Sequence, residues 1–219
     1  MPTFTDIASQ MVEIARSFHA RGWTLATSGN FSAVLSRDPL RLAITASGVD
    51  KEALTEQDIL EIDSGGRFAG RAAAPVAEAT AGPRPSAETP LHLMLVRRRG
   101  AGAVLHTHSI WSTVLSDVHA GAGGLALQGY EMLKGLQGVS THEHTEWLPI
   151  IENAQDMTAL AACVEQALDS HAGVHGFLLR RHGLYTWGVD LAQAKRHVEA
   201  LEFLLEVFAR SRGLAKGEP

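Results

Sequence analysis

The stretch AVLHTH at residues 103–108 joins a short apolar run to two histidines separated by one threonine. A short apolar run of this kind predicts a buried strand. Because side chains repeat every two residues along a strand, His106 and His108 would leave the same face. A strand end is also rigid, as a metal site requires. The pair therefore favours one small divalent ion, although His-x-His also arises by chance in a chain with eleven histidines.

A third metal ligand is expected from another ordered segment. His182 lies in RRHG (180–183), after an apolar run at 177–179 and before a glycine that allows close backbone approach. The alternative is an ordinary histidine in a hairpin turn. Three neutral imidazoles around Zn²⁺ leave one position open for substrate, which is typical of a catalytic site. Such an ion acts as a Lewis acid on a carbonyl or an adjacent hydroxyl.

A second His-x-His motif provides an internal control for the first. His142 and His144 have the same spacing, but their neighbours are Ser, Thr and Glu without a strand signal, so we expect a solvated loop. His92 is expected in the core or behind the site. The other histidines are expected at the surface or half-buried, without partners. These are His19, His119, His171, His175 and His197.

Composition bounds the class of protein. The chain has 219 residues with 45% apolar side chains, which predicts one or two globular domains. A net charge of −5 argues against sequence-independent binding of nucleic acid. The single cysteine, Cys163, excludes an intrachain disulfide and a cysteine-based zinc finger. No apolar run reaches about 18 residues and the first ten residues lack a signal pattern, so we expect a cytoplasmic protein that does not bind membranes.

Helical and strand patterns alternate along the chain, which predicts an α/β domain with one core. Predicted strands cover residues 31–35, 42–45, 59–62, 103–105, 147–151, 176–179 and 184–187, the last two as a hairpin. The first predicted helix stops near Gly22. Three more cover residues 86–98, 109–117 and 157–168, and a last helix begins after its cap, Asp190. Segment 69–85 is expected to be loop or extended chain, and the tail after Arg212 is expected to fray.

Three short segments have the composition of anion-binding loops. Residues 27–30 (TSGN) and 45–48 (TASG) combine hydroxyl side chains with a glycine that exposes backbone N–H groups. Ser86 is predicted as the N-cap of a helix, where free N–H groups favour phosphate. Each loop alone could be a plain turn. Together they indicate a phosphorylated substrate, provided that they converge in space.

Two carboxylates are candidates for proton transfer. Glu88 lies in the first turn of the helix predicted to begin at Ser86. Glu131 lies in an otherwise apolar, glycine-flanked stretch at 130–135. A carboxylate in apolar surroundings has a raised pKa and can exchange protons near neutral pH. The alternative for both is a solvated glutamate on a helix face.

Five motifs in this order resemble the class II aldolase family. They are SGN (28–30), TASG (45–48), PSAE (85–88), HTH (106–108) and RHG (181–183). The resemblance covers about residues 5–210. It implies that residues 1–219 form a single class II aldolase-like domain, with a central mixed, mostly antiparallel β-sheet and helices on both faces.

The family resemblance also implies roles for particular residues. It implies that His106, His108 and His182 bind one zinc ion per subunit and that Glu131 is the catalytic acid or base. Glu88 is a second candidate, either a base that touches the metal or part of the pocket wall. The implied phosphate site comprises Ser28, Gly29, Asn30, Ser47, Gly48 and Ser86. The resemblance further implies a homotetramer with sites near the subunit interfaces.

Within the family, two segments resemble dehydratases of the methionine salvage pathway. They are QGYEMLKG (128–135), continuing to LPIIEN (148–153), and LRRHGLYTWG (179–188). The resemblance implies zinc-dependent loss of water from a methylthio ketose 1-phosphate, with removal of the C3 proton and expulsion of the C4 hydroxyl. A sugar-phosphate aldolase or epimerase would use the same metal chelate. An adducin-like binding module without catalysis is a third alternative, which retention of the three histidines opposes.

Overall fold

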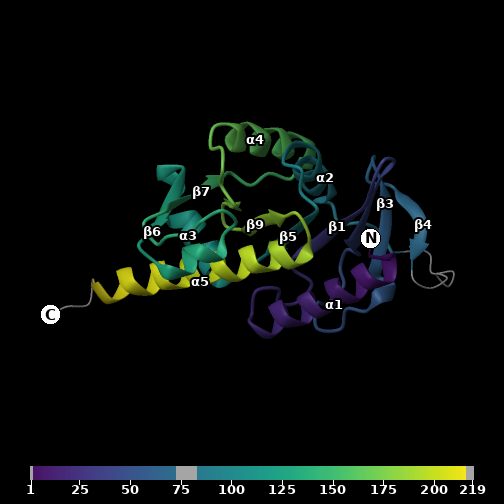
Figure 1. Ribbon diagram of the computed structural model, residues 1–219, viewed down its shortest axis with the longest axis horizontal. Helices are drawn as coiled ribbons and strands as arrows, with labels where there is room; N and C mark the ends of the chain where they lie inside the picture. Colours follow the sequence, from purple (N-terminus) through teal and green to yellow (C-terminus); the bar gives the residue numbers. More distant parts are fainter. Residues whose placement is uncertain (1, 73–82, 216–219) are drawn as a thin grey trace.

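The computed structural model describes residues 2–72 and 83–215 (Figure 1). The strands are β1 (Asn30–Arg37), β2 (Leu40–Thr45), β3 (Ile59–Asp63), β4 (Phe68–Ala72), β5 (Ala103–Thr107), β6 (Gly124–Gln128), β7 (Thr145–Ile151), β8 (Gly176–Leu179) and β9 (Gly183–Gly188). The α-helices are α1 (Phe4–Ala20), α2 (Thr89–Arg98), α3 (Ile110–Val118), α4 (Met157–Asp169) and α5 (Leu191–Ala215). Short 3₁₀ helices are η1 (Glu56–Asp58), η2 (Ala120–Ala122) and η3 (Glu131–Gly135).

The nine described strands form one mixed sheet in the order β4-β3-β2-β1-β5-β9-β8-β7-β6. Among them, β7 and β8 pair in parallel, and every other neighbouring pair is antiparallel. The predicted mixed, mostly antiparallel sheet is confirmed. β5 lies near the middle of the sheet between β1 and β9, so the AVLHTH stretch is supported from both sides.

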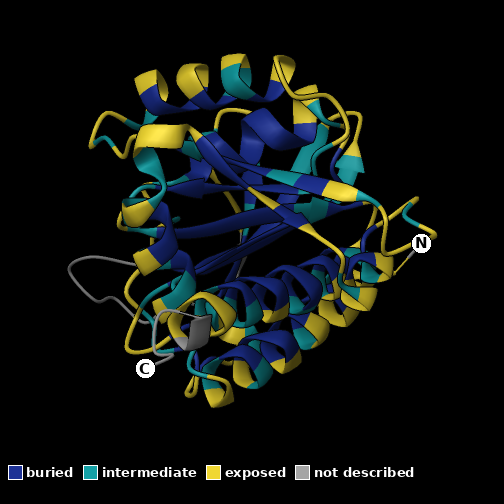
Figure 2. Cartoon of the chain, turned by 90° about the vertical axis from the view of Figure 1, so that its left-hand side faces the viewer, coloured by how far each residue is buried: buried dark blue, intermediate teal, exposed yellow. Residues whose placement is uncertain are grey.

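Helices cover both faces of the sheet, as predicted. α2 and α4 pack on one face, and α1, α3 and α5 pack on the other. Figure 2 shows buried strands between two helical layers whose outer faces are exposed. β5 alternates between the layers: Val104 packs with α2 and α4, whereas Ala103 and Leu105 pack with α1. The period of two therefore turns His106 toward the α2 side.

Most predicted elements are found, and the differences have local causes. α2 begins at Thr89 instead of Ser86, because the Ser86 hydroxyl accepts a hydrogen bond from the Glu88 N–H (3.2 Å) and forms a turn before the helix. The predicted N-cap role of Ser86 is therefore wrong. β4 and β6 were not predicted, and part of the predicted loop at 69–85 lies outside the described residues.

The last helix differs from the prediction at its C-terminal end. Asp190 caps its start, since its carboxylate accepts a hydrogen bond from the Gln193 N–H at 2.8 Å. α5 then continues to Ala215, three residues beyond the point where fraying was expected. Within the described ranges, no helix has the length and apolar character needed to cross a bilayer.

Candidate active site

Three histidines from two distant segments meet at one end of the sheet. His106 is the fourth residue of β5 and is fully buried, and His108 follows the strand with its N–H donating to the Trp23 carbonyl at 2.7 Å. His182 lies in the tight connection between β8 and β9. A Cβ atom at Gly183 would lie 2.0 Å from the Thr107 carbonyl oxygen, so only glycine allows this hairpin to approach β5.

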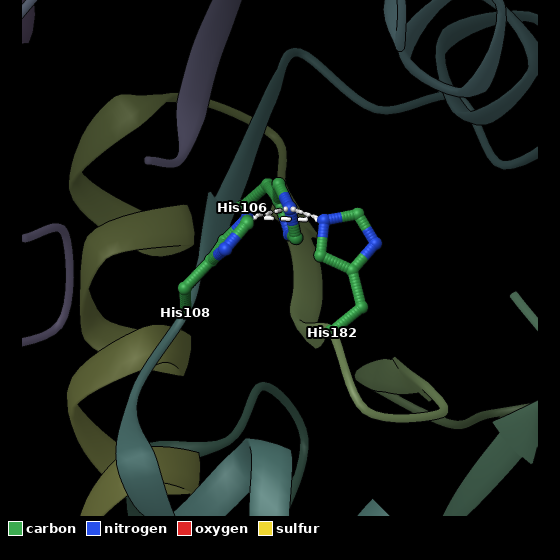
Figure 3. Close-up of side chains that lie close together, drawn as sticks. All are labelled: His106, His108 and His182. Atoms are coloured by element: carbon green, nitrogen blue, oxygen red, sulfur yellow. Dashed lines mark hydrogen bonds between the residues drawn. The ribbon is translucent and has the colours of Figure 1, made fainter. Parts of the chain in front are cut away.

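The Nε2 atoms of the three imidazoles point toward one another (Figure 3). They are separated by 2.7 Å (His106 to His108), 3.1 Å (His108 to His182) and 3.3 Å (His106 to His182). The His106 Nδ1–H donates to the Leu184 carbonyl at 2.9 Å, which leaves the Nε2 lone pair facing the centre. Tetrahedral zinc with bonds of about 2.0–2.1 Å places its nitrogen ligands about 3.3 Å apart. The donor set thus fits one such ion.

The electrostatics of the cluster keep the three rings neutral. Burial, then the neighbouring His108 and His182, hold the pKa of His106 well below its ordinary value. Burial, then His182 and the Lys51 ammonium, lower the pKa of His108 to about 3. Burial also lowers the pKa of His182, against the opposing effect of Glu88. Neutral imidazole is the form that a metal ion binds.

Glu88 lies directly beside the three histidines. Its Oε1 atom is 3.3 Å from His182 Nε2, and its Oε2 atom is 3.6 Å from His106 Nε2. The side chain is 13% exposed, and Asn30 donates a hydrogen bond to Oε2 at 2.5 Å. This carboxylate can contribute a metal ligand or accept a proton from a molecule bound at the cluster.

A pocket of about 310 Å³ opens beside Glu88, His108 and His182. All six residues predicted to bind phosphate line it: Ser28, Gly29, Asn30, Ser47, Gly48 and Ser86. The three anion-binding loops therefore converge, which is the condition set by the sequence. The Ser28 hydroxyl is buried in the described structure without a hydrogen-bond partner, as expected for a group that binds a ligand.

Backbone contacts between the loops form the pocket. Ala46 and Pro85 make an isolated β-bridge, and the Ser47 N–H donates to the Arg84 carbonyl at 2.9 Å. Gly29 has φ +73°, and a Cβ there would lie 2.7 Å from the His106 carbonyl oxygen. Glycine at this position therefore lets the first loop lie against the histidine strand.

Sequence reasoning missed several residues at the pocket. Asn153 and Gln155 reach it from the connection between β7 and α4, and Met157 reaches it from the first position of α4. The available signal was the polar run that follows the apolar strand at 145–151. Lys51 was also missed: it is 1% exposed, and its ammonium donates to the Val49 carbonyl at 2.9 Å. Burial lowers the pKa of Lys51, against the effect of nearby Asp50 and Asp58.

Glu131 lies outside this pocket, in surroundings opposite to those predicted. It begins η3, its side chain is 69% exposed, and it pairs with Lys134 and with His142 Nδ1 (3.1 Å). Lys134 lowers the pKa of Glu131 and His142 adds to the effect, so the expected raised pKa is wrong. Within one chain, Glu131 therefore does not lie beside His106, His108 and His182.

Two histidines expected to lack partners are well connected. His197 is 3% exposed, donates from Nδ1 to the Trp187 carbonyl at 2.7 Å, and accepts the Gln137 N–H at Nε2. His175 binds the buried carboxylate of Glu146 through both Nδ1 (3.0 Å) and its backbone N–H (2.8 Å). Both contacts come from segments far apart in the sequence, which spacing rules do not detect.

Comparison with known proteins identifies relatives over nearly the whole chain. The family described as class II aldolase and adducin N-terminal domain matches residues 9–209. A methylthioribulose-1-phosphate dehydratase of Sorangium cellulosum is 45% identical over 97% of this chain and 96% of its own. One from Xylella fastidiosa is 47% identical over 91% of this chain and 86% of its own. L-fuculose-1-phosphate aldolase from Thermus thermophilus has a TM-score of 0.72 at 25% identity, with 97% of both chains covered.

Proposed function

Because the chain belongs to the class II aldolase and adducin family, we propose that it is a hydro-lyase of that family. Its substrate is 5-methylthioribulose 1-phosphate, its product 2,3-diketo-5-methylthiopentyl 1-phosphate, and its place the methionine salvage pathway. The substrate assignment draws on relatives named methylthioribulose-1-phosphate dehydratase, which are 42–47% identical to this chain. The observation that carries the proposal is the convergence of three neutral imidazoles, one carboxylate and three anion-binding loops on one pocket.

In this proposal, the pocket binds the substrate at two places, its phosphate group and its C2 carbonyl. Ser28, Ser47 and Ser86 donate hydroxyl hydrogen bonds to the phosphate, and the N–H groups around Gly29 and Gly48 add backbone donors. His106, His108 and His182 would hold one Zn²⁺ ion, which would supply Lewis-acid polarisation of the C2 carbonyl and so make the C3 proton more acidic.

The protein residues then move two protons. A carboxylate takes the C3 proton, and Glu88 has the position for this step beside the three histidines. The C4–O bond breaks as an acid protonates the leaving hydroxyl, so one molecule of water departs. The resulting enol takes up a proton at C4 and loses the proton of its C3 hydroxyl, which gives the 2,3-diketone. Glu131 is the second carboxylate proposed for these proton transfers.

Glu131 can take part only if another copy of the chain brings it to the site. Its carboxylate is exposed and outside the pocket of its own chain. The adjacent Met132 is also exposed, as is Phe203 on α5. We therefore propose a homotetramer in which η3 of one subunit lies at the pocket of its neighbour. In this arrangement, the carboxylate of Glu131 is exposed in its own chain and acts in catalysis at the pocket of the neighbouring subunit.

Product analysis by mass after incubation with methylthioribulose 1-phosphate tests the proposal. Dehydration predicts a product about 18 mass units lighter than the substrate, which is the mass of one water. The second candidate is a sugar-phosphate aldolase or epimerase, favoured by Glu88 beside the histidines, where the aldolases are expected to keep a base. Cleavage of fuculose or rhamnulose phosphate without loss of water from the first substrate would establish it instead.

Elemental analysis tests the metal separately from the reaction. About one zinc per chain is expected in protein purified without chelator. Chelation should abolish dehydration, and added zinc should restore it. A metal-free chain with unchanged thermal stability and no turnover would instead support an adducin-like binding module.

A further inference from the structure

A row of hydrogen bonds behind the site connects the core to Glu88. His92, on α2, is fully buried, and its Nδ1 atom lies 2.7 Å from the Ser32 hydroxyl. Its Nε2 atom lies 2.5 Å from the Asn30 Oδ1 atom. Asn30 in turn contacts Glu88 Oε2 (2.5 Å) and the Ser86 hydroxyl (3.2 Å) through its Nδ2 atom. Ser32 and Asn30 are also buried, so the two contacts of His92 are shielded from water.

The chemistry of the groups sets the direction of each hydrogen bond. An ionised carboxylate only accepts, so the Asn30 amide must donate to Glu88 through its N–H. The amide oxygen then faces His92, whose Nε2 must carry a hydrogen. A neutral imidazole with hydrogen on Nε2 has a bare Nδ1, which accepts the Ser32 hydroxyl. Burial lowers the pKa of His92 to about 3, in agreement with a neutral ring.

The opposite orientation of the Asn30 amide would damage the site. It would turn the amide oxygen toward the Glu88 carboxylate and leave two acceptors in contact. It would also turn the amide N–H₂ group toward the His92 N–H. Both contacts are repulsive, and a buried polar group without a partner is costly. Glu88 and the His92 tautomer with hydrogen on Nε2 therefore favour the same orientation of Asn30 from its two sides.

We propose that His92 is a positioning residue for the reaction: it orients the Asn30 amide, and Asn30 then fixes the Glu88 carboxylate beside the three histidines. The role of Glu88 in turnover rests on the proposed function, whereas the hydrogen-bonded row does not. Asn30, which the family resemblance implies as a phosphate ligand, thereby also orients the carboxylate. His92 touches neither the pocket nor the three Nε2 atoms and acts through Asn30.

Two substitutions of similar polarity separate positioning from packing. In His92→Gln, the longer side chain can present an N–H near the former Nε2 position, so it can still donate to Asn30. In His92→Asn, the shorter side chain reaches the Ser32 side and leaves Asn30 without its donor. We expect His92→Asn to lower kcat about 10–100-fold at little change in KM and full metal content. His92→Gln should recover most of that loss.

A matched control and a spectroscopic readout complete the experiment. His171→Asn changes an exposed histidine that follows α4 and forms its hydrogen bond with the Ala167 carbonyl, outside this row, so it should leave kcat as in the parent protein. In the metal-loaded parent protein, ¹⁵N NMR of labelled histidines should find His92 neutral with hydrogen on Nε2 from about pH 5 to about pH 9. This second readout needs no substrate.

The outcomes distinguish this proposal from the proposed function. Hydrogen on Nδ1 of His92, or an equal loss of kcat in the Gln and Asn variants, would overturn the positioning role. Full kcat in His92→Asn would overturn it as well. If the parent protein releases no water from methylthioribulose 1-phosphate, the proposed function fails. The NMR result then still decides whether His92 orients Asn30.

Discussion

Two His-x-His pairs in this chain share their spacing but differ in the groups that their imidazoles face. His106 and His108 bring their Nε2 atoms to 2.7 Å at the end of a central strand. His142 and His144 lie in the connection before β7 and turn to different carboxylates, Glu131 at 3.1 Å and Glu146 at 3.0 Å. The first pair faces a third imidazole, whereas the second pair is satisfied by acids. Spacing alone therefore does not make a metal site.

The electrostatics of the two histidine regions are also opposed. In the first region, burial and neighbouring imidazoles lower the pKa values of His106 and His108. In the second, His175 shares the Glu146 carboxylate with His144. Burial alone would lower the pKa of His175, but the hydrogen bond and charge of Glu146 outweigh burial and raise it. A histidine ready for a metal has a free lone pair and no proton, whereas His175 keeps its proton for a carboxylate.

The largest effect is expected from His106→Ala. The substitution removes one of the three proposed histidine ligands, so bound zinc and turnover should disappear together. The expected loss of activity is about 10³-fold or more. Metal content by elemental analysis and dehydration by product mass measure the two losses. His144→Ala is the matched control and should keep full metal content. Equal metal content in both variants would mean that the two pairs do not differ as described.

No loss of metal but a large loss of turnover is expected from Glu131→Gln. The amide cannot exchange a proton as a carboxylate does, so kcat should fall about 10²–10⁴-fold. Metal content should stay complete, since the proposed ligands of the ion are His106, His108 and His182 and Glu131 is not among them. Loss of zinc from Glu131→Gln would show that this residue acts on the metal site.

Much of the fold and of the metal cluster could be predicted because the signals are local. The period of a strand places His106 and His108 on one face, and Gly183 marks the close approach that brings His182. The environment of Glu131 could not be predicted in this way. Its apolar neighbours in sequence indicate burial, but η3 lies at the surface and its carboxylate pairs with Lys134. The contact of His92 with Asn30 spans 62 positions and is set by packing of α2 on the sheet.

Glu146→Gln should weaken the fold in a pH-dependent way. Burial acts to raise the pKa of Glu146, but hydrogen bonds from His175 and His144 together outweigh burial. The pKa of Glu146 is therefore below its ordinary value. Its stabilisation is present above its ordinary pKa of 4.5 and is lost as pH falls through the folded value. The raised pKa of His175 gives stabilisation that is complete below 6.5 and is lost as pH rises through its folded value.

The two conditions overlap between about pH 4.5 and pH 6.5, where the ion pair contributes most. In that window, Glu146→Gln should lower the free energy of unfolding by roughly 1–3 kcal/mol. The difference from the parent protein should shrink as pH rises through the raised pKa of His175, because the imidazole then loses its charge. Urea unfolding over a series of pH values that begins in this window measures it. A difference that does not change with pH would contradict the ion pair.

The smallest effect is expected from His142→Ala, which tests the comparison from its other side. If His142 is a partner of an exposed carboxylate, its removal leaves metal content unchanged and raises the pKa of Glu131 slightly toward its ordinary value, since Lys134 contributes more to the lowering. Carboxyl ¹³C NMR titration measures that pKa, and Lys134→Gln should shift it further in the same direction. Zinc loss in His142→Ala would instead make the second His-x-His pair part of a metal site. The contrast between the two pairs would then lie in which metal each binds, and no longer in whether it binds one.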